Sequence, residues 1–181
     1  MLKSVRPSSP PRLTVQLVPL LALALLPLFT AAGLAAQPTP VELGRARADV
    51  SAVLDALHTM ASEADFDGYF ALYAQEAVFL GTDATERWTR QEFMDYTRAR
   101  FDTGTGWTYH MLERHVSVAS DGRTAWFDER LETENLGETR GSGVLVLEDG
   151  RWKIAQYNLT IPIPNEMARE VAQRIRALKG G

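Results

Sequence analysis

The chain has 181 residues, no cysteine and a formal net charge of −4. The absence of cysteine excludes disulfides, thiolate metal ligands, a cysteine nucleophile and the lipid anchor of bacterial lipoproteins. No cluster of Lys and Arg stands out, so we expect neither nucleic acid nor an anionic membrane surface as a partner.

The first predicted element is an export signal. Residues 13–36 contain no charged residue, and the segment before them holds three basic residues and no acidic one. A basic leader, an apolar stretch and small residues at its end are the parts of a secretory signal. Val15–Leu28 is short for a membrane span, which needs roughly 20 residues. We predict a signal peptide at 1–36, cleaved near Ala36, and a periplasmic or secreted protein without membrane contact; an uncleaved anchor helix is the alternative.

The part after the signal is acidic and long enough for one core. Three of the 19 basic residues and none of the 23 acidic ones lie in the leader, so the remainder carries 16 − 23 = −7. Its length suffices for a single hydrophobic core. We divide it into a short lead at 37–48, a domain at 49–166, and a C-terminal helix and tail at 167–181.

Two capping boxes predict the starts of helices. Thr39–Glu42 and Thr89–Glu92 both place a threonine three residues before a glutamate, so that each side chain can bond the other residue's backbone N–H. Apolar residues between Val50 and Met60 follow at helical spacing. The first of these helices is expected to end near Ala64, and the second near Phe101.

Shorter elements are predicted between those two helices. The aromatic run at 69–73 indicates a short helix, and Ala77–Leu80 a short strand. Residues 83–88, which include Trp88, are expected to form a loop.

From Trp107 onwards apolar residues alternate, which predicts strands. Asp121-Gly122 and Asp149-Gly150 are strong hairpin signals. The expected strands are 107–119, 124–133, 139–148 and 151–161, followed by a helix at 165–178. The predicted fold is α+β: a strongly curved antiparallel sheet packed on about three helices, plus a C-terminal helix.

Two-residue turns fix the register of this sheet. The first turn pairs His115 with Asp128 and, on the opposite face, Arg114 with Glu129. The second turn pairs Gly143 with Gln156 and Gly141 with Asn158. A four-residue loop at 135–138 would place Asp128 beside Leu145.

The register predicts two faces, neither of them plainly a solvent face. The first mixes aromatic and polar residues, as the wall of a small-molecule pocket does, and its two glycines, Gly141 and Gly143, leave space above them. The second is mainly aliphatic and is expected to be a homodimer interface; it includes Val116, Phe127, Val146 and Tyr157.

These features together resemble the SnoaL-like, nuclear transport factor two-like superfamily, over roughly Asp49–Glu166. The resemblance rests on Tyr69–Tyr73, Phe79–Trp88, Glu113–Val116, Ala125–Glu129, Arg140–Leu145 and Gly150–Leu159, and it is nearest to an exported subgroup without assigned activity. It implies a cone-shaped fold with a cavity on the concave side of the sheet. The superfamily includes isomerases, dehydratases and cyclases as well as non-catalytic modules, so the fold alone does not assign a function.

The His115–Asp128 pair is the candidate for acid–base catalysis, with the carboxylate orienting the imidazole. The alternative is a buried polar pair that only fixes the register. Other residues predicted to contact a ligand are Tyr109, Trp126, Gln156, Asn158, Trp152 and Trp88. The alternative for the aromatic residues is a role in the core, and for the two amides it is bonding to helix ends and loops.

We expect neither a metal site nor a cofactor. The three histidines do not converge in this register, and there is no glycine-rich phosphate loop or serine-nucleophile motif. Three hypotheses remain: a domain that binds a small, mostly apolar molecule, a cofactor-free lyase or isomerase that uses His115 and Asp128, and a homodimerising interaction module.

Overall fold

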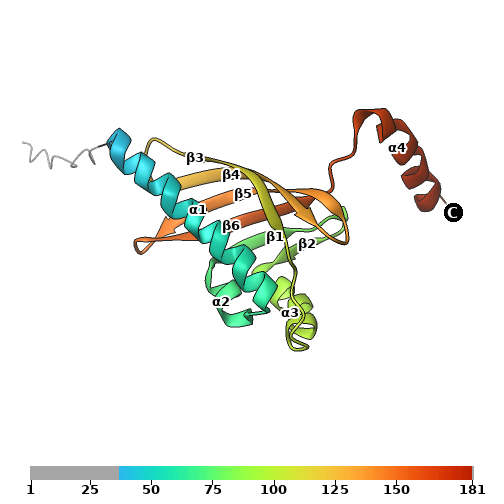
Figure 1. Ribbon diagram of the computed structural model, residues 1–181, viewed down its shortest axis with the longest axis horizontal. Coiled ribbons are helices and arrows are strands. Elements are labelled where there is room, and N and C mark those ends of the chain that lie inside the picture. Colours follow the sequence, from blue (N-terminus) through green and yellow to red (C-terminus); the bar gives the residue numbers. More distant parts are fainter. Residues whose placement is uncertain (1–36, 181) are drawn as a thin grey trace, which may run out of the picture. The chain divides into compact units, whose positions relative to one another are not determined.

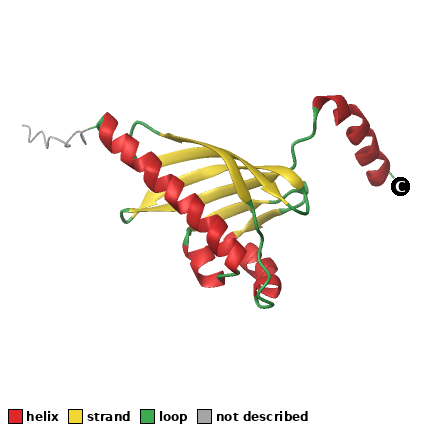
Figure 2. Ribbon diagram, in the orientation of Figure 1, coloured by secondary structure: helices red, strands yellow, loops and turns green. Residues whose placement is uncertain are grey.

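The computed structural model describes residues 37–180; the predicted signal peptide at 1–36 lies outside them. A curved, unclosed sheet has the strand order β2-β1-β6-β5-β4-β3 (Figures 1 and 2). All neighbouring strands are antiparallel except β1 and β6, which are parallel. The strands are β1 Tyr73–Leu80, β2 Arg87–Thr89, β3 His110–Val118, β4 Thr124–Thr133, β5 Gly137–Glu148 and β6 Arg151–Thr160.

Helices cover one face of this sheet, which we call the concave face. They are α1 Pro40–Glu63, α2 Phe66–Ala71 and α3 Arg90–Phe101, and α4 Asn165–Lys179 follows the last strand. Both predicted capping boxes are present, at Thr39 with Glu42 and at Thr89 with Glu92. The predicted α+β cone is confirmed, although Trp88, expected in a loop, belongs to the short strand β2.

The predicted register of the first hairpin is confirmed. His115 pairs with Asp128 and Arg114 with Glu129. Because side chains alternate across a strand, these two pairs lie on opposite faces. Glu129 lies on the concave face with buried Phe127, whereas Asp128 is exposed.

The predicted register of the middle hairpin is wrong. Thr133 pairs with Gly137, so the loop at 134–136 has three residues, and Asp128 faces Ser142 rather than Leu145. Gly137 has φ +67, a left-handed conformation that glycine adopts readily and that three-residue hairpin loops use. This shift by an odd number of residues exchanges the two faces of β5 relative to β4.

The predicted register of the second hairpin, between β5 and β6, is wrong beyond a β-bulge. Leu145 pairs with Ile154 as predicted, but Val144 then pairs with Gln156, which leaves Ala155 as the extra residue. Consequently Gly143 faces Tyr157 rather than Gln156, and Gly141 faces Leu159 rather than Asn158.

The core lies between the concave face and helices α1 to α3. Phe127 and Tyr157 are 3% and 4% exposed there, and Val116 and Val146 pack against the core as partly buried residues. Phe127, Tyr157 and Val116 of the predicted dimer interface therefore face the protein's own helices. The register shift moves Val146, which pairs with Thr124, to the convex face. The predicted interface residues thus do not share one face. A homodimer through the sheet stays a prediction, and it would require the opposite, convex face.

Helix α4 is amphipathic and carries exposed apolar side chains. Met167, Ile175 and Leu178 are 51%, 45% and 85% exposed. No helix within residues 37–180 is long and apolar enough to cross a membrane.

Candidate functional site

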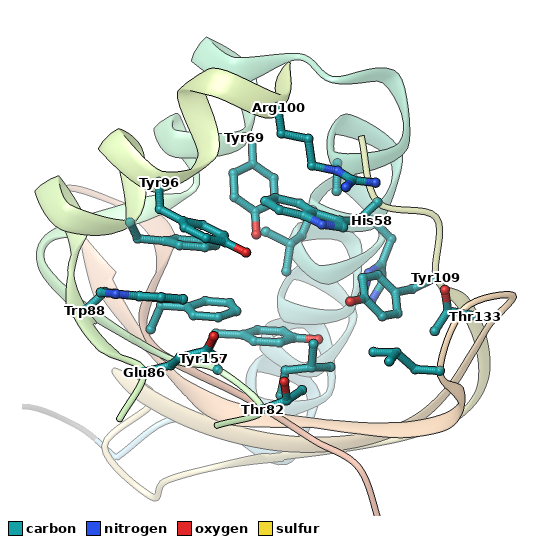
Figure 3. Close-up of a pocket in the computed structure, with 18 of the residues that line it drawn as sticks. His58, Tyr69, Thr82, Glu86, Trp88, Tyr96, Arg100, Tyr109, Thr133 and Tyr157 are labelled. Atoms are coloured by element: carbon teal, nitrogen blue, oxygen red, sulfur yellow. The ribbon is translucent and has the colours of Figure 1, made fainter. Parts of the chain in front are cut away.

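A cavity of about 270 Å³ opens between the helices and the concave face of the sheet (Figure 3). Residues of its walls belong to helices α1, α2 and α3 and to strands β1, β2, β4 and β6. Others belong to the loop after β1, the segment before β3 and the loop after β4. The aromatic residues among them are Tyr69, Phe79, Trp88, Phe93, Tyr96, Trp107, Tyr109 and Tyr157; the polar ones include His58, Thr82, Glu86, Arg100, Thr133 and Asn135.

Many of the aromatic rings in the wall are nearly parallel. The stacked ring pairs have interplanar angles between 5° and 22°, and Figure 3 shows Trp88, Tyr96 and Tyr157 edge-on. The rings in these pairs are Phe79, Trp88, Phe93, Tyr96, Trp107 and Tyr157. The wall therefore presents flat apolar faces with a common orientation.

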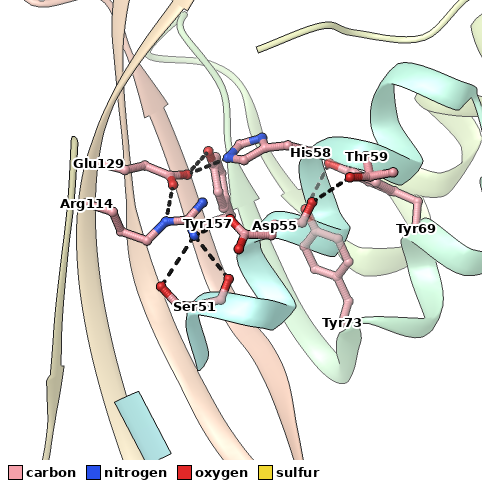
Figure 4. A network of polar contacts seen from close by, with 9 residues as sticks. All are labelled: Ser51, Asp55, His58, Thr59, Tyr69, Tyr73, Arg114, Glu129 and Tyr157. Carbon is pink, nitrogen blue, oxygen red and sulfur yellow. Dashed lines mark hydrogen bonds and ion pairs between the residues drawn. The ribbon is translucent and has the colours of Figure 1, made fainter. Parts of the chain in front are cut away.

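Glu129 is the centre of a buried polar network behind this wall (Figure 4). The residue is 1% exposed, and its Oε1 lies 2.9 Å from Nε2 of His58 and 3.1 Å from the hydroxyl of Tyr157. Its Oε2 accepts a hydrogen bond of 2.7 Å from Nε of Arg114. Three partners thus satisfy one buried carboxylate, as buried charges require.

The network keeps Glu129 ionised. Burial raises the pKa of its carboxyl, but the hydrogen bond and charge of His58, together with those of Arg114, outweigh burial and leave the pKa below its ordinary value. An ionised carboxylate only accepts hydrogen bonds, so Nε2 of His58 carries the proton in this contact. Glu129 therefore fixes the ring of His58 and its tautomer.

Arg114 ties this network to α1. Its Nη1 donates to the carbonyl of Ser51 at 3.0 Å and to Oδ1 of Asp55 at 2.6 Å. Burial lowers the pKa of Arg114, but the charges and hydrogen bonds of Glu129 and Asp55 raise it above its ordinary value. A permanent positive charge consequently lies beside the Glu129 carboxylate.

His58 connects the network with the cavity. Its side chain is 12% exposed and forms part of the cavity wall. Among residues 37–180, the hydrogen bond of its ring is made by Nε2 and not by the other ring nitrogen, Nδ1. With the proton on Nε2, Nδ1 of a neutral His58 offers a lone pair to a bound molecule.

Two buried tyrosines of the wall, Tyr157 and Tyr69, keep their hydroxyl protons. Burial raises the pKa of Tyr157 well above its ordinary range, and the charge of Glu129 raises it further. Burial also raises the pKa of Tyr69, against the hydrogen bond with Tyr73, whose hydroxyl lies 3.0 Å away. Both phenols therefore stay protonated.

Gly141 makes room for the network. A Cβ built there would collide with the Tyr157 hydroxyl and lie 2.9 Å from Oε1 of Glu129. The space that the sequence predicts above this glycine exists, but the side chains of Glu129 and Tyr157 fill it.

The predicted acid–base pair is not on the cavity wall. His115 and Asp128 face each other across two strands, but on the convex side, where the His115 side chain is 65% exposed. Nε2 of His115 lies 3.2 Å from Oε1 of Glu113 rather than against Asp128. Their expected position in the pocket is wrong because β3 and β4 direct the alternate residues, Arg114 and Glu129, to the concave side.

Of the residues predicted to contact a ligand, Tyr109 and Trp88 line the cavity. Trp126 is 51% exposed on the convex face, and Trp152 is buried in the core without lining the cavity. The bulge at Ala155 and the register shift place Gln156 and Asn158 on the convex side as well.

The sequence prediction missed His58, Glu129 and Tyr157 as site residues. Its one available signal was the pairing of Arg114 with Glu129 on an otherwise aliphatic face, because buried charges on such a face need partners. Within residues 37–180, no group of three or more His, Asp or Glu side chains could hold a metal ion.

Comparison with known proteins identifies related folds. Residues 50–164 match the SnoaL-like domain family, and no curated protein matches the chain. An NTF2-like protein of unknown function from Pseudomonas putida is 14% identical, with 68% of this chain and 92% of that chain covered and a TM-score of 0.58.

Two candidate dehydratases have similar structures. One, a candidate scytalone dehydratase from Novosphingobium aromaticivorans, is 11% identical, with 69% and 89% of the chains covered and a TM-score of 0.59. The other, from the NTF2-like family of Streptomyces avermitilis, is 14% identical, with 67% and 99% covered and a TM-score of 0.57. At these identities the likeness shows the fold alone.

Proposed function

The chain belongs to the SnoaL-like domain family of the NTF2-like superfamily, and we propose that its cavity binds a small, mostly apolar molecule. The observation that carries this proposal is an aromatic wall interrupted by a few polar groups, which is the usual composition of small-molecule sites. The volume of about 270 Å³ is slightly below the range of roughly 300–1,000 Å³ for drug-sized ligands. The ligand is therefore small.

Two tryptophans in different places allow a matched test of this proposal. Trp88 lines the cavity, whereas Trp126 is 51% exposed on the convex face. Titration of the protein with 2-naphthol, followed by calorimetry, should show binding that Trp88→Ala weakens and Trp126→Ala leaves unchanged. Equal effects of the two substitutions, or no binding by the unaltered protein, would reject the cavity as the binding site.

We also propose that the domain acts after export. Support comes from the charge pattern of the N-terminal residues, which lie outside the described part of the chain. Expression in a bacterium, periplasmic extraction and intact-mass measurement should give a product that begins near residue 37. Full-length protein in the membrane fraction would favour the anchor helix.

The second candidate function is cofactor-free acid–base chemistry, such as that of a lyase or isomerase. His58 lines the cavity, and its hydrogen bond with Glu129 within residues 37–180 is made by Nε2 and leaves Nδ1 for a ligand. A base fixed in this way can remove a proton next to a carbonyl. The phenol of Tyr109, whose ring centre lies 6.2 Å from that of His58, can donate to the developing oxyanion. Two proteins with similar structures carry dehydratase names, which agrees with this class of reaction.

Proton exchange tests this candidate without knowledge of the natural substrate. The ketone 2-tetralone is small, apolar and enolisable, and its α-hydrogens exchange with D₂O at a rate that NMR measures. The protein should accelerate this exchange, His58→Gln should abolish the acceleration, and His115→Gln should not. Exchange at the rate of buffer alone would reject the enzyme and leave the binding proposal standing.

A further inference from the structure

Resting on the proposed binding function, we propose that the ligand is a flat conjugated ring carrying one carboxylate-type anionic group, which Arg100 receives at the cavity wall. The aromatic wall is flat, and Arg100 is the only Arg or Lys among the described residues that line the cavity.

The parallel rings favour a flat ligand. Trp88 and Tyr96 stack at 4.7 Å with an angle of 22°, and Tyr96 and Trp107 lie at 6.4 Å with an angle of 6°. A planar conjugated molecule can lie against such faces over its whole area, and offset stacking adds to the energy of burial. A puckered aliphatic ring of the same size makes fewer of these contacts.

Arg100 is held ready for an anion. Its Nε and Nη2 donate to the carbonyl of Gly106 at 3.2 Å and 2.9 Å, and its Cζ lies 5.4 Å from the ring centre of Trp107. These contacts fix the guanidinium plane while Nη1 makes no hydrogen bond with any residue in 37–180. A guanidinium held in one plane is well suited to bind a carboxylate.

No carboxylate of the described chain forms an ion pair with Arg100. Arg114 pairs with Glu129 and Asp55, and Arg130 pairs with Glu113 and Glu138. The charge of Arg100 is thus left to solvent or to a ligand.

The charged groups of the cavity wall are distributed unevenly, with the positive one on one side and the negative one on the other. Figure 3 shows Arg100 and Glu86 on opposite sides, and the hydroxyls of Tyr96 and Tyr109 turned toward the interior. Burial raises the pKa of Tyr109, whereas the charge of Arg100 lowers it and Tyr96 raises it, so these three groups act on one another. An anionic group is attracted to the Arg100 side, with phenol donors beside it, and is repelled from the Glu86 side.

One Arg in an apolar cavity matches one negative charge. Arg100 is exposed and is the one positive charge among the described residues of the wall, so it matches the single charge of a carboxylate better than the higher charge of a phosphoryl group. The anion is therefore of the carboxylate class.

Three probes of similar size separate the parts of the proposal. In calorimetry, 2-naphthoate should bind about fivefold more tightly than the neutral 2-naphthamide, because Arg100 is exposed and solvent weakens its ion pair with the carboxylate. The non-planar decahydro-2-naphthoate, which has the same carbon skeleton, should bind more weakly than 2-naphthoate. Arg100→Met should remove the preference for 2-naphthoate over 2-naphthamide and keep the binding of 2-naphthamide.

Arg151→Met is the control for loss of one positive charge, since Arg151 is exposed and outside the cavity, and circular dichroism should confirm that both variants are folded. Equal affinity for naphthoate and naphthamide, or a preference that survives in Arg100→Met, overturns this inference and leaves the apolar binding site standing. Equal affinity for decahydro-2-naphthoate and 2-naphthoate overturns the flat ring. Failure of every probe to bind overturns the proposed function itself.

Discussion

Tyr157 donates a hydrogen bond of 3.1 Å to Glu129 from β6 to β4, across the intervening strand β5. The residue of β5 that pairs with Glu129 is Gly141, and only a residue without a side chain leaves space for this bond. The contact joins the cavity wall, to which Tyr157 belongs, with the buried charges of the network. It therefore couples the stability of the sheet to the properties of the candidate site.

Gly141→Ala should destabilise the protein by about 2 kcal/mol, because the added Cβ collides with the Tyr157 hydroxyl and crowds Glu129. Urea denaturation followed by circular dichroism measures the change. Gly44→Ala is the matched control: nothing lies within 4 Å of its Cβ position in α1, so the same substitution there should stabilise by about 0.5–1 kcal/mol. Effects of the same sign would contradict the crowding argument.

Glu129→Gln should cost about 3 kcal/mol, because it leaves the buried guanidinium of Arg114 without its main counter-charge. Chemical denaturation gives the free energy of unfolding. Glu138→Gln removes an exposed partner of Arg130 and should change stability little, as surface ion pairs do. Similar losses in both variants would show that burial of the Glu129 charge has no special effect.

Stability should fall in acid through Glu129. Its pKa is lowered in the folded protein, so the unfolded chain takes up the proton first as the pH falls. The contribution is complete above the ordinary pKa of a glutamate and is lost as the pH falls from that value through the lowered folded pKa. Glu42 and Glu92 also have lowered pKa values, but both are exposed and contribute less. Thermal melts between neutral and acidic pH should show a shallower dependence for Glu129→Gln; identical pH profiles would contradict this.

His58 and His115 should differ in their effect on ligand binding. His58→Gln alters the cavity wall and should weaken the binding of 2-naphthol, whereas His115→Gln alters the convex face, where the side chain is 65% exposed. Calorimetric titration of both variants measures the difference. A loss of affinity in His115→Gln with none in His58→Gln would mean that the ligand binds on the convex face, at the residues that the sequence analysis predicted.

Removal of residues 165–181 should leave the domain folded. Large apolar side chains of α4 contact solvent: Met167 is 51% exposed and Leu178 is 85% exposed. Deletion of the helix therefore exposes little of the hydrophobic core. The melting temperature should change by less than about 2 °C. A larger decrease would mean that α4 packs against the domain in solution.

Local features were predictable from the sequence because neighbouring residues determine them. The capping boxes at Thr39 and Thr89 and the Asp121-Gly122 turn place each partner within a few residues, so the helix starts and the β3–β4 register follow directly. The pairing of Arg114 with Glu129 was available in the same way.

Only the tertiary structure decided which face of the sheet carries the site. The three-residue loop before Gly137 and the bulge at Ala155 each change the strand register by an odd number of residues. Because side chains of a strand alternate with a period of two, each change moves a whole set of residues to the other face of the sheet. The contact between His58 and Glu129 joins residues 71 positions apart, and it depends on how α1 packs against the sheet. The sequence by itself therefore determined the α+β class, the helix starts and the β3–β4 register. Packing across the sheet determined that the cavity contains His58 and Tyr157 rather than His115 and Asp128.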